Sequence, residues 1–340
     1  MRRRALALGA CLLLAGSCHR GAAPDAGTSG DAAGASDAAG ALDAAAADAT
    51  AAADAGPAAD PLAGAGAVTL VAGGFMFVEG PQWVASRGTL LFSDIPGDTI
   101  YELTPGTGAV APFRTPSGNS NGLGLTPDGR LLAAEHGNRR VSVSDLGGPP
   151  AALADAYMGA ALNSPNDVVA RSDGTVYFTD PPYGITDAQR ELSFMGVFRV
   201  PAPGAPVPDP VAEWMGDLLA RPNGIGLSPD ESVLYVSDTD AGVVRAFDVA
   251  AGGALGVERV LSADVPGADG LAVDAAGNLF VATSAGIRAL SPDGATWGTL
   301  AVPEQPANCA FGDADARTLY ITARTSLYQV RLAGPGLPTH

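Results

Sequence analysis

The chain has 340 residues, of which 47% are hydrophobic and 6% aromatic, so it can bury a large core. Its 45 glycines and 27 prolines disfavour a helical bundle and favour a turn-rich, all-β fold. The net charge of −17 argues against nucleic acid or an anionic membrane as a partner, and the complete absence of lysine excludes a P-loop or a Schiff-base mechanism.

Residues 1–18 have the pattern of an export signal. Three arginines at positions 2 to 4 precede an apolar run that ends in Leu14-Ala15-Gly16-Ser17-Cys18. Small residues directly before a cysteine resemble a bacterial lipobox, so we expect a lipidated Cys18. This predicts an exported periplasmic or cell-envelope lipoprotein that touches the membrane only through its anchor. An ordinary signal peptide that is cleaved nearby is the alternative.

Residues 19–60 are composed almost entirely of Ala, Asp, Gly, Ser, Thr and Pro, with an aspartate every five or six residues. Such a segment cannot bury enough apolar surface to offset the entropy of ordering it, which predicts a disordered tether. The folded domain is therefore expected over residues 61–340. Cys309 is the only cysteine in that range, so the domain has no internal disulfide.

The expected domain repeats one pattern six times. Each repeat begins at a polar residue, here called the lead residue, and continues through a short apolar stretch, a turn and a second apolar stretch with polar residues at its end. Successive lead residues are 39 to 57 positions apart, which is typical of four-stranded propeller blades. The midway turns predict hairpins with the lead residue at the open end. We predict an all-β fold, a six-bladed β-propeller, with residues 68–71 pairing into the last blade to close the ring. The lead residues are Glu79, Asn121, Asn166, Asn223, Asp269 and Asn308.

Six equivalent lead residues in a propeller would form one ring at a mouth of the central channel. Any single Asn or Asp before Gly is an ordinary turn residue. Six carboxylates and amides at the same position of every repeat, however, are costly to bury unless they share a binding partner. A hard cation is the simplest such partner. Oxygen donors favour Ca²⁺, with another divalent cation as the alternative, and disfavour Zn²⁺.

The motifs at these positions resemble the SMP-30/gluconolactonase family over most of the expected domain. Members of that family are six-bladed propellers, and many are Ca²⁺-dependent lactonases that act on sugar lactones. The resemblance implies metal ligands at Glu79, Asn166, Asn223 and Asp269, and a substrate-side polar position at Asn121. The motifs include Val78-Glu79-Gly80-Pro81, Ser164-Pro165-Asn166-Asp167-Val168, Arg221-Pro222-Asn223-Gly224-Ile225, Asp269-Gly270-Leu271, Thr179-Asp180-Pro181-Pro182-Tyr183-Gly184, Glu135-His136-Gly137 and Pro306-Ala307-Asn308-Cys309-Ala310-Phe311-Gly312.

Four protein oxygens on Ca²⁺ would leave positions for a lactone carbonyl and water, so the ion could act as a Lewis acid. Water then needs a base, and both Asp269 and His136 are candidates. His136 is also a candidate substrate contact, as is Asp180, although strand-end aspartates such as Asp180 are expected mainly to support the site by hydrogen bonding. The expected partner is a small lactone.

Three other functions are alternatives to this interpretation. A Ser-His-Asp hydrolase would have to use His136 and lacks a Gly-x-Ser-x-Gly elbow. A nicotinamide or flavin enzyme lacks a βαβ unit around a Gly-rich turn. The serious rival is a non-catalytic surface propeller that binds a sugar or a protein, because propellers carry many functions.

Overall fold

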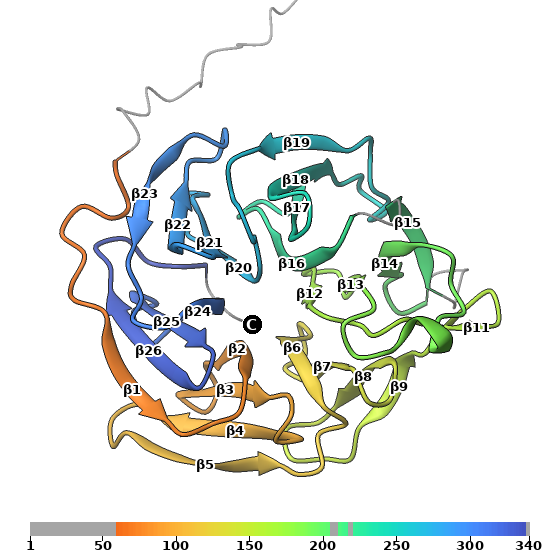
Figure 1. The fold of residues 1–340 in the computed structure, drawn as a ribbon, viewed down its shortest axis with the longest axis horizontal. Coiled ribbons are helices and arrows are strands. Elements are labelled where there is room, and N and C mark those ends of the chain that lie inside the picture. The colour runs from red at the N-terminus through yellow and green to blue at the C-terminus, as the bar shows by residue number, and fades with distance from the viewer. Residues whose placement is uncertain (1–58, 205–209, 217–219, 338–340) are drawn as a thin grey trace, which may run out of the picture. The chain divides into compact units, whose positions relative to one another are not determined.

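Six four-stranded antiparallel sheets stand around a central axis in the computed structural model (Figure 1). The structure describes residues 59–204, 210–216 and 220–337. The predicted signal over 1–18 and nearly all of the predicted tether over 19–60 lie outside these residues. The six sheets confirm the predicted propeller of four-stranded blades.

The first three blades follow the chain without crossover, each from its innermost strand outward. Their innermost strands are β2, β6 and β12, which face the channel in Figure 1. The strands are β2 (Val78–Val84), β3 (Thr89–Asp94), β4 (Thr99–Thr104) and β5 (Ala109–Arg114), then β6 (Ser120–Leu125), β7 (Leu131–Glu135), β8 (Arg140–Ser144) and β9 (Ala151–Ala154), then β12 (Val168–Ala170), β13 (Val176–Asp180), β14 (Met195–Val200) and β15 (Val211–Gly216).

Blades four and five repeat this order, and the sixth takes its outermost strand from the other end of the domain. A small β10 (Ala156–Tyr157) and β11 (Ala160–Ala161) hairpin and the 3₁₀ helix η1 (Asp187–Gln189) are insertions around blade three. The remaining strands are β16 (Pro222–Leu227), β17 (Val233–Asp238), β18 (Val243–Asp248) and β19 (Arg259–Ser262), then β20 (Leu271–Val273), β21 (Leu279–Thr283), β22 (Gly286–Leu290) and β23 (Thr296–Leu300), then β24 (Pro306–Gly312), β25 (Thr318–Ala323), β26 (Ser326–Arg331) and β1 (Thr69–Gly73).

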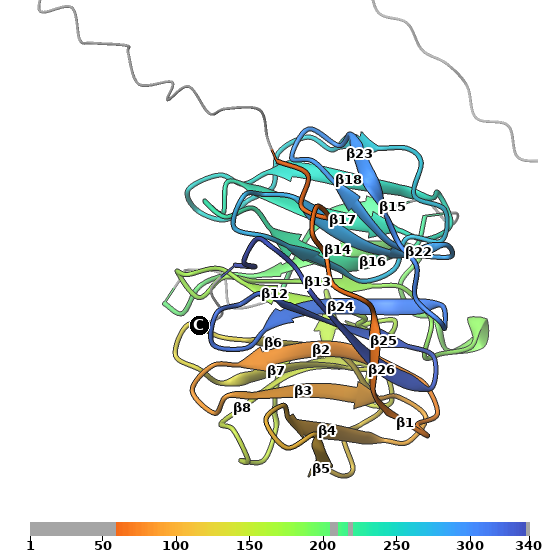
Figure 2. The same cartoon turned by 90° about the vertical axis from the view of Figure 1, so that its left-hand side faces the viewer.

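The ring is closed by β1, which pairs antiparallel with β26 from Thr69–Gln329 to Gly73–Ser326. Figure 2 shows the two strands side by side at one side of the molecule. This confirms the predicted closure. Closure of this kind leaves the last blade with a complete sheet and joins the two ends of the domain by main-chain hydrogen bonds.

The core lies between neighbouring blades, where the alternate residues of each strand meet the next sheet. Phe280 of β21, for example, packs against Phe311 of β24 with ring centroids 5.3 Å apart, in the same cluster as the buried Cys309. Cys309 is a free thiol, as predicted for this domain. Among the described residues, no helix is long and apolar enough to cross a membrane.

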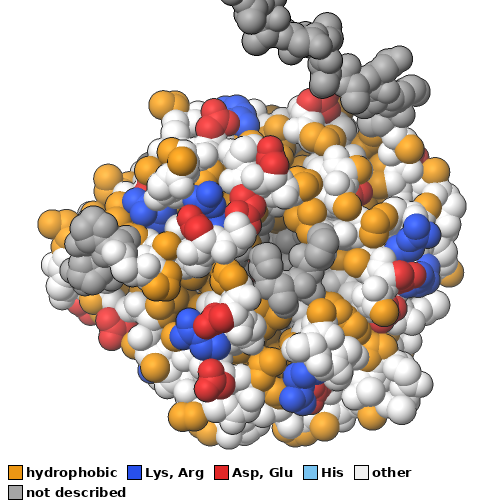
Figure 3. All heavy atoms as spheres, turned by 180° about the vertical axis from the view of Figure 1, so that it is seen from behind, with side chains coloured by type: hydrophobic (Ala, Val, Ile, Leu, Met, Phe, Trp, Pro, Cys, Tyr) orange, Lys and Arg blue, Asp and Glu red, His pale blue; other side chains and the backbone are white. Residues whose placement is uncertain are grey.

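Many of the surface charges of the described residues lie in neighbouring pairs of opposite sign. Seen from behind, acidic and basic side chains lie beside one another and hydrophobic side chains are scattered between them (Figure 3). Arg331 with Asp315 at 2.5 Å and Arg87 with Glu102 at 2.8 Å are examples. Exposed pairs of this kind each contribute little to stability, about 0–1 kcal/mol.

Candidate functional site

Each lead residue lies at or next to an irregularity in the pairing of its blade, or just outside the paired strands. In four blades the pairing of the first and second strands is interrupted at the lead position, as between Glu79 and Gln82 and between Pro222 and Ile225. In the other two, Asn166 and Asp269 lie two residues before the first paired residue of the strand. A bulge re-aims a side chain, so the sequence places polar groups here that do not point into the apolar layers between blades.

The glycine after a lead residue allows neighbouring blades to approach closely. Gly80 has a φ of +52°, and a Cβ there would lie 2.1 Å from the carbonyl oxygen of Asn121 in the next blade. A Cβ on Gly270 would lie 1.9 Å from the side chain of Asn308. Only glycine fits such positions, and the lead residues are consequently drawn together at one mouth of the channel, here called the lead mouth.

Hydroxyl groups on the second strands fix the lead residues of the following blades. Thr179 of β13 donates to the carbonyl oxygen of Asn223 at 2.6 Å, and Ser237 of β17 donates to that of Asp269 at 2.5 Å. These bonds join blade three to four and blade four to five within the ring. The polar residues at the ends of the second strands therefore position the main chain of the site.

Three lead amides form one hydrogen-bonded chain across the lead mouth. Asn121 Nδ2 donates to Asn166 Oδ1 at 2.7 Å, and Asn166 Nδ2 donates to Asn223 Oδ1 at 2.7 Å. Asn223 Nδ2 donates in turn to Thr239 Oγ1 at 3.1 Å. All three asparagines are buried, so the structure brings these predicted residues of three different blades into direct contact.

The two lead carboxylates, Glu79 and Asp269, act on each other electrostatically at this mouth. Burial, followed by repulsion from Asp269, raises the pKa of Glu79 well above its usual range. Burial raises the pKa of Asp269 to about 7, against a hydrogen bond from Asn223 that lowers it. Both shifts have the same cause, because each carboxylate would have to hold a negative charge away from water and close to another acid.

Asp167 is a third carboxylate in the channel and was not predicted as a site residue. Its Oδ1 accepts from the Val168 amide at 2.9 Å and its Oδ2 from the Ile225 amide at 3.3 Å. Burial raises its pKa to about 7, and its charge raises the pKa values of both Glu79 and Asp269. The repeats held a signal for it, since an aspartate stands where four of the six repeats have glycine after the lead residue.

His136, the predicted base and substrate contact, lies directly after β7 and is 7% exposed. Asn121 Nδ2 lies 3.3 Å from its Nε2 and donates to it when that nitrogen is unprotonated. Burial lowers the pKa of His136 to about 4, so the imidazole is neutral at pH 7. The structure thus brings His136 to the amide chain, but as a weak base.

Asp180, the other predicted substrate contact, is fully buried at the end of β13. Its two carboxylate oxygens each accept a backbone N–H at 2.8 Å, one from Asn163 and one from Ser164. These contacts hold the segment that leads into Asn166, which is the supporting role expected of strand-end aspartates. A direct contact between Asp180 and substrate stays a prediction.

The donors at the lead mouth suit a hard divalent cation. Two carboxylates and two amides, from Glu79, Asp269, Asn166 and Asn223, offer only oxygen ligands of the kind that Ca²⁺ takes. None of the ion pairs in the described part of the chain involves Glu79, Asp167 or Asp269, so their charge lacks a basic partner in contact. No three His, Cys, Asp or Glu side chains of the described residues are grouped to hold a metal, so a site here depends on the amides.

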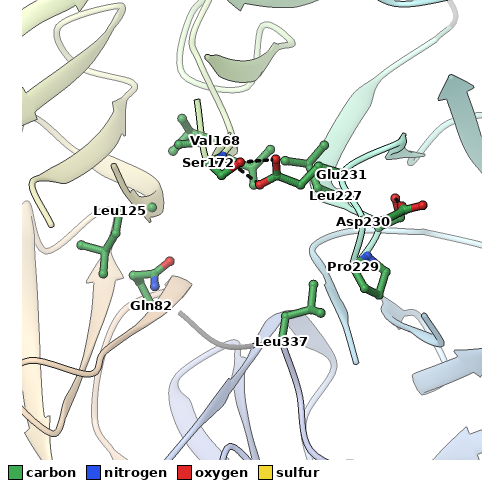
Figure 4. Close-up of a pocket in the computed structure, with 13 residues that line it drawn as sticks. Gln82, Leu125, Val168, Ser172, Leu227, Pro229, Asp230, Glu231 and Leu337 are labelled. Atoms are coloured by element: carbon green, nitrogen blue, oxygen red, sulfur yellow. Dashed lines mark hydrogen bonds between the residues drawn. The ribbon is translucent and has the colours of Figure 1, made fainter. Parts of the chain in front are cut away.

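The opposite end of the channel, the rear mouth, differs in chemistry. A cavity of about 550 Å³ opens there between the turns of blades three and four, and a second of about 180 Å³ lies deeper and reaches Asp167. Leu337 lines both cavities, and Figure 4 shows it across from Gln82 and Leu125. The rear lining is mainly apolar. Its two acids, Glu231 and Asp230, already accept hydrogen bonds from Ser172 and Ser228, each at 2.7 Å, so the polar chemistry is concentrated at the lead mouth.

Known proteins with similar sequences are lactonases. A family model described as SMP-30/Gluconolactonase/LRE-like region matches residues 77–325. A gluconolactonase of Zymomonas mobilis is 35% identical over 298 residues, which are 78% of this chain and 81% of that protein. A 6-deoxy-6-sulfogluconolactonase of Pseudomonas putida is 30% identical over 254 residues, covering 72% and 82% of the two chains.

Solved structures show the same fold. The gluconolactonase XC5397 of Xanthomonas campestris aligns with a TM-score of 0.71 and 32% identity, over 78% of this chain and 89% of that one. A calcium-binding regucalcin of Agrobacterium tumefaciens aligns with a TM-score of 0.66 over 79% of this chain and 96% of that one. The regucalcin is only 20% identical, so its likeness concerns the fold alone.

Proposed function

The chain belongs to the SMP-30/gluconolactonase/LRE-like family, and on that premise we propose that it is a lactonase that hydrolyses a sugar lactone with the help of Ca²⁺. The names of its relatives support a hydrolase of cyclic esters, with aldonolactones such as gluconolactone as the first substrates to test. The observation that carries the proposal is the set of buried carboxylates and linked amides at the lead mouth.

In this proposal Glu79, Asn166, Asn223 and Asp269 hold the cation through side-chain oxygens. When bound, Ca²⁺ would polarise the lactone carbonyl and offset the negative charge that develops on its oxygen. Its two positive charges would balance the two lead carboxylates, and the lactone itself is neutral. Asn121 keeps Asn166 in place through its 2.7 Å hydrogen bond, and in this proposal its Oδ1 accepts from a substrate hydroxyl.

Hydrolysis adds water across the ester bond. The water oxygen bonds to the carbonyl carbon, the bond from that carbon to the ring oxygen breaks, and a proton moves from the water to the ring oxygen. Asp269 is the better placed of the two candidate bases, because it is partly exposed at the lead mouth. His136, with its lowered pKa, serves in this proposal to orient Asn121.

The test is hydrolysis of glucono-1,5-lactone by the purified domain, followed by proton release, before and after EDTA treatment and after Ca²⁺ is restored. We expect activity to disappear with EDTA and to return with Ca²⁺. A domain that binds Ca²⁺ but hydrolyses no lactone would favour the non-catalytic surface propeller. Hydrolysis that is unimpaired in EDTA would contradict the proposed Ca²⁺ dependence, whereas the proposed hydrolase activity would stand.

We also propose that the protein is exported and anchored through a lipidated Cys18. The proposal is supported only by the sequence pattern of residues 1–18. Fractionation of cells tests it, because a Cys18→Ala chain should leave the membrane pellet. Equal distribution of the wild type and the Cys18→Ala chain would contradict a lipid anchor.

A further inference from the structure

Tyr183 is the only aromatic side chain among the described residues that is exposed rather than buried or half-buried, at 39%. It lies in the segment between β13 and β14, directly after Pro181-Pro182. The burial of other aromatic rings between blades makes this exposure unusual, since a large apolar ring in water normally finds cover. Because the ring lies next to the site residues, its exposed part is available to a ligand bound there.

The hydroxyl of Tyr183 faces the amide chain at the lead mouth. Asn223 Nδ2 lies 3.5 Å from the Tyr183 hydroxyl oxygen, and partial burial, with a smaller contribution from the negative charge of Asp269, raises the pKa of the phenol. The next residue, Gly184, is fixed by a hydrogen bond from its amide to Ser164 Oγ at 2.7 Å. The ring therefore stands beside the lead residues of blades four and five, on a segment held to the site.

Arg221 fixes the ring from the neighbouring blade. Its guanidinium carbon lies 5.4 Å from the centre of the Tyr183 ring, a cation–π contact. Asp240 holds the same guanidinium at 3.0 Å, and the pair is about as exposed as the ring itself. With one ring face against Arg221 and the hydroxyl toward Asn223, the exposed part of Tyr183 is a preformed apolar surface at the edge of the site.

A sugar lactone has two kinds of surface, C–H faces and hydroxyl edges. The lead mouth offers many partners for hydroxyl groups but few for a C–H face, and sites that bind such molecules combine aromatic surfaces with a few polar groups. We propose that Tyr183 is the specificity-determining substrate contact of this site: its ring packs on a C–H face of the lactone and its hydroxyl bonds a sugar hydroxyl. This inference rests on the proposed lactonase function.

The experiment compares Tyr183→Leu and Tyr183→Phe with the wild type on glucono-1,5-lactone and on γ-butyrolactone, which lacks hydroxyls. Tyr183→Leu removes the flat ring and should lower kcat/KM for gluconolactone roughly 10- to 100-fold, mainly through KM, because an aromatic contact contributes about 1–3 kcal/mol. Tyr183→Phe keeps the ring, so it should lower kcat/KM several-fold for gluconolactone and leave γ-butyrolactone hydrolysis unchanged. Met158→Ala, at an 89% exposed residue in the turn between β10 and β11, is the matched control.

Two further measurements separate substrate binding from a structural role. Melting temperature and Ca²⁺ affinity, by calorimetric titration, should be the same in the Tyr183 variants and the wild type. Titration with glucono-lactam, which is not hydrolysed, should show weaker binding by Tyr183→Leu. Wild-type activity for Tyr183→Leu would overturn the inference, and so would a parallel loss of Ca²⁺ affinity, which would show an effect through Asn223. A wild type that neither hydrolyses nor binds either compound would remove the proposed function and this inference together.

Discussion

His136 illustrates how burial decides what a residue can do. A histidine at a strand end, near a predicted metal site, is an attractive general base on paper, but 7% exposure and a pKa of about 4 make it a weak one. We expect His136→Gln, which can still accept from Asn121, to keep kcat within roughly tenfold of the wild type, whereas loss of a true base costs about 10²- to 10⁴-fold. Stopped-flow or pH-stat kinetics measure this.

The companion variant is His136→Ala, which leaves Asn121 without its acceptor. It should lower kcat/KM more than His136→Gln does, with Ca²⁺ affinity retained. If both variants lose kcat equally and by more than about 10²-fold with the metal retained, the histidine is the base after all.

Glu79 is the residue on which cation binding should depend most directly. It is 3% exposed, and its raised pKa reflects burial close to Asp269. Glu79→Gln preserves shape but removes one negative charge, and oxygen sites tune Ca²⁺ affinity by ligand charge. We expect at least a tenfold weaker Ca²⁺ affinity by calorimetric titration. Glu102→Gln, which alters an ion pair with Arg87 and a hydrogen bond from Thr89 away from the lead mouth, should leave the affinity unchanged. Equal affinity in both variants would exclude Glu79 as a ligand.

At the level of single residues, the repeat pattern predicted those site residues whose side chain has the same role in every blade. The lead residues were found because they stand at the same position in all six repeats. Asn121, Asn166 and Asn223 do form one hydrogen-bonded chain of amides. Asp167 was missed because Asn-Asp also fits an ordinary turn. Tyr183 was missed because the proposed role of its ring depends on solvent exposure, which the sequence pattern does not reveal. Neither burial nor the 3.3 Å contact between Asn121 and His136 can be obtained from spacing alone.

Among the elements, the first strand of each blade carries the tightest constraint. A Cβ on Gly122 of β6 would lie 2.3 Å from Asp167 Oδ1 and 2.7 Å from the carbonyl oxygen of Asn166. Gly122→Ala must therefore push blades two and three apart at the site, and we expect a loss of about 1–3 kcal/mol in the free energy of unfolding together with loss of activity. Chemical denaturation measures the change in the free energy of unfolding.

Gly106 provides the matched control for this substitution. Nothing lies within 4 Å of a Cβ placed there, and its φ is not in the left-handed region. Gly106→Ala should stay within about 0.5 kcal/mol of the wild type. An equally stable Gly122→Ala would mean that neighbouring blades can separate more easily than these contacts indicate.

Asp180, at the end of β13, should make stability depend on pH. Burial raises its pKa in the folded protein from 3.8 to about 7, so the unfolded chain loses this proton first as pH rises. Between about pH 4 and pH 7 the unfolded state then binds fewer protons, and the free energy of unfolding falls by up to about 1.4 kcal/mol per pH unit from this group. Above pH 7 the contribution is constant.

Denaturation at several pH values, with Asp180→Asn beside the wild type, isolates this effect. The variant removes the titration but also one of the two acceptors for the Asn163 and Ser164 amides, so it should be less stable near pH 4 by about 1–3 kcal/mol. The difference between the two proteins should shrink as pH rises to 7. Parallel curves would show that Asp180 does not titrate in this range.

For the molecule as a whole, the sequence was sufficient to predict the number of blades and the closure of the ring. Both depend on patterns that repeat over 39 to 57 residues, and a propeller has few ways to pair its last edge. The insertions around blade three, β10, β11 and η1, were not predicted because they occur once. The lining of the rear mouth by Leu337 depends likewise on a single packing contact.

Ring closure by β1 yields the last prediction, which compares two shortened chains. A chain that begins at Ala59 keeps every described strand, so its melting temperature and lactone hydrolysis should match those of the full chain, as expected if residues 19–60 are a tether. A chain that begins at Gly74 lacks β1 and its pairing with β26 from Thr69 to Gly73. Loss of these main-chain bonds and of the packing of Val71 should cost about 3–5 kcal/mol and expose a strand edge that promotes aggregation. Thermal denaturation and light scattering measure both effects.

A Gly74 chain as stable as the Ala59 chain would show that the sixth blade does not need its outer strand. A destabilised Ala59 chain would show that residues before 59 contribute to the fold.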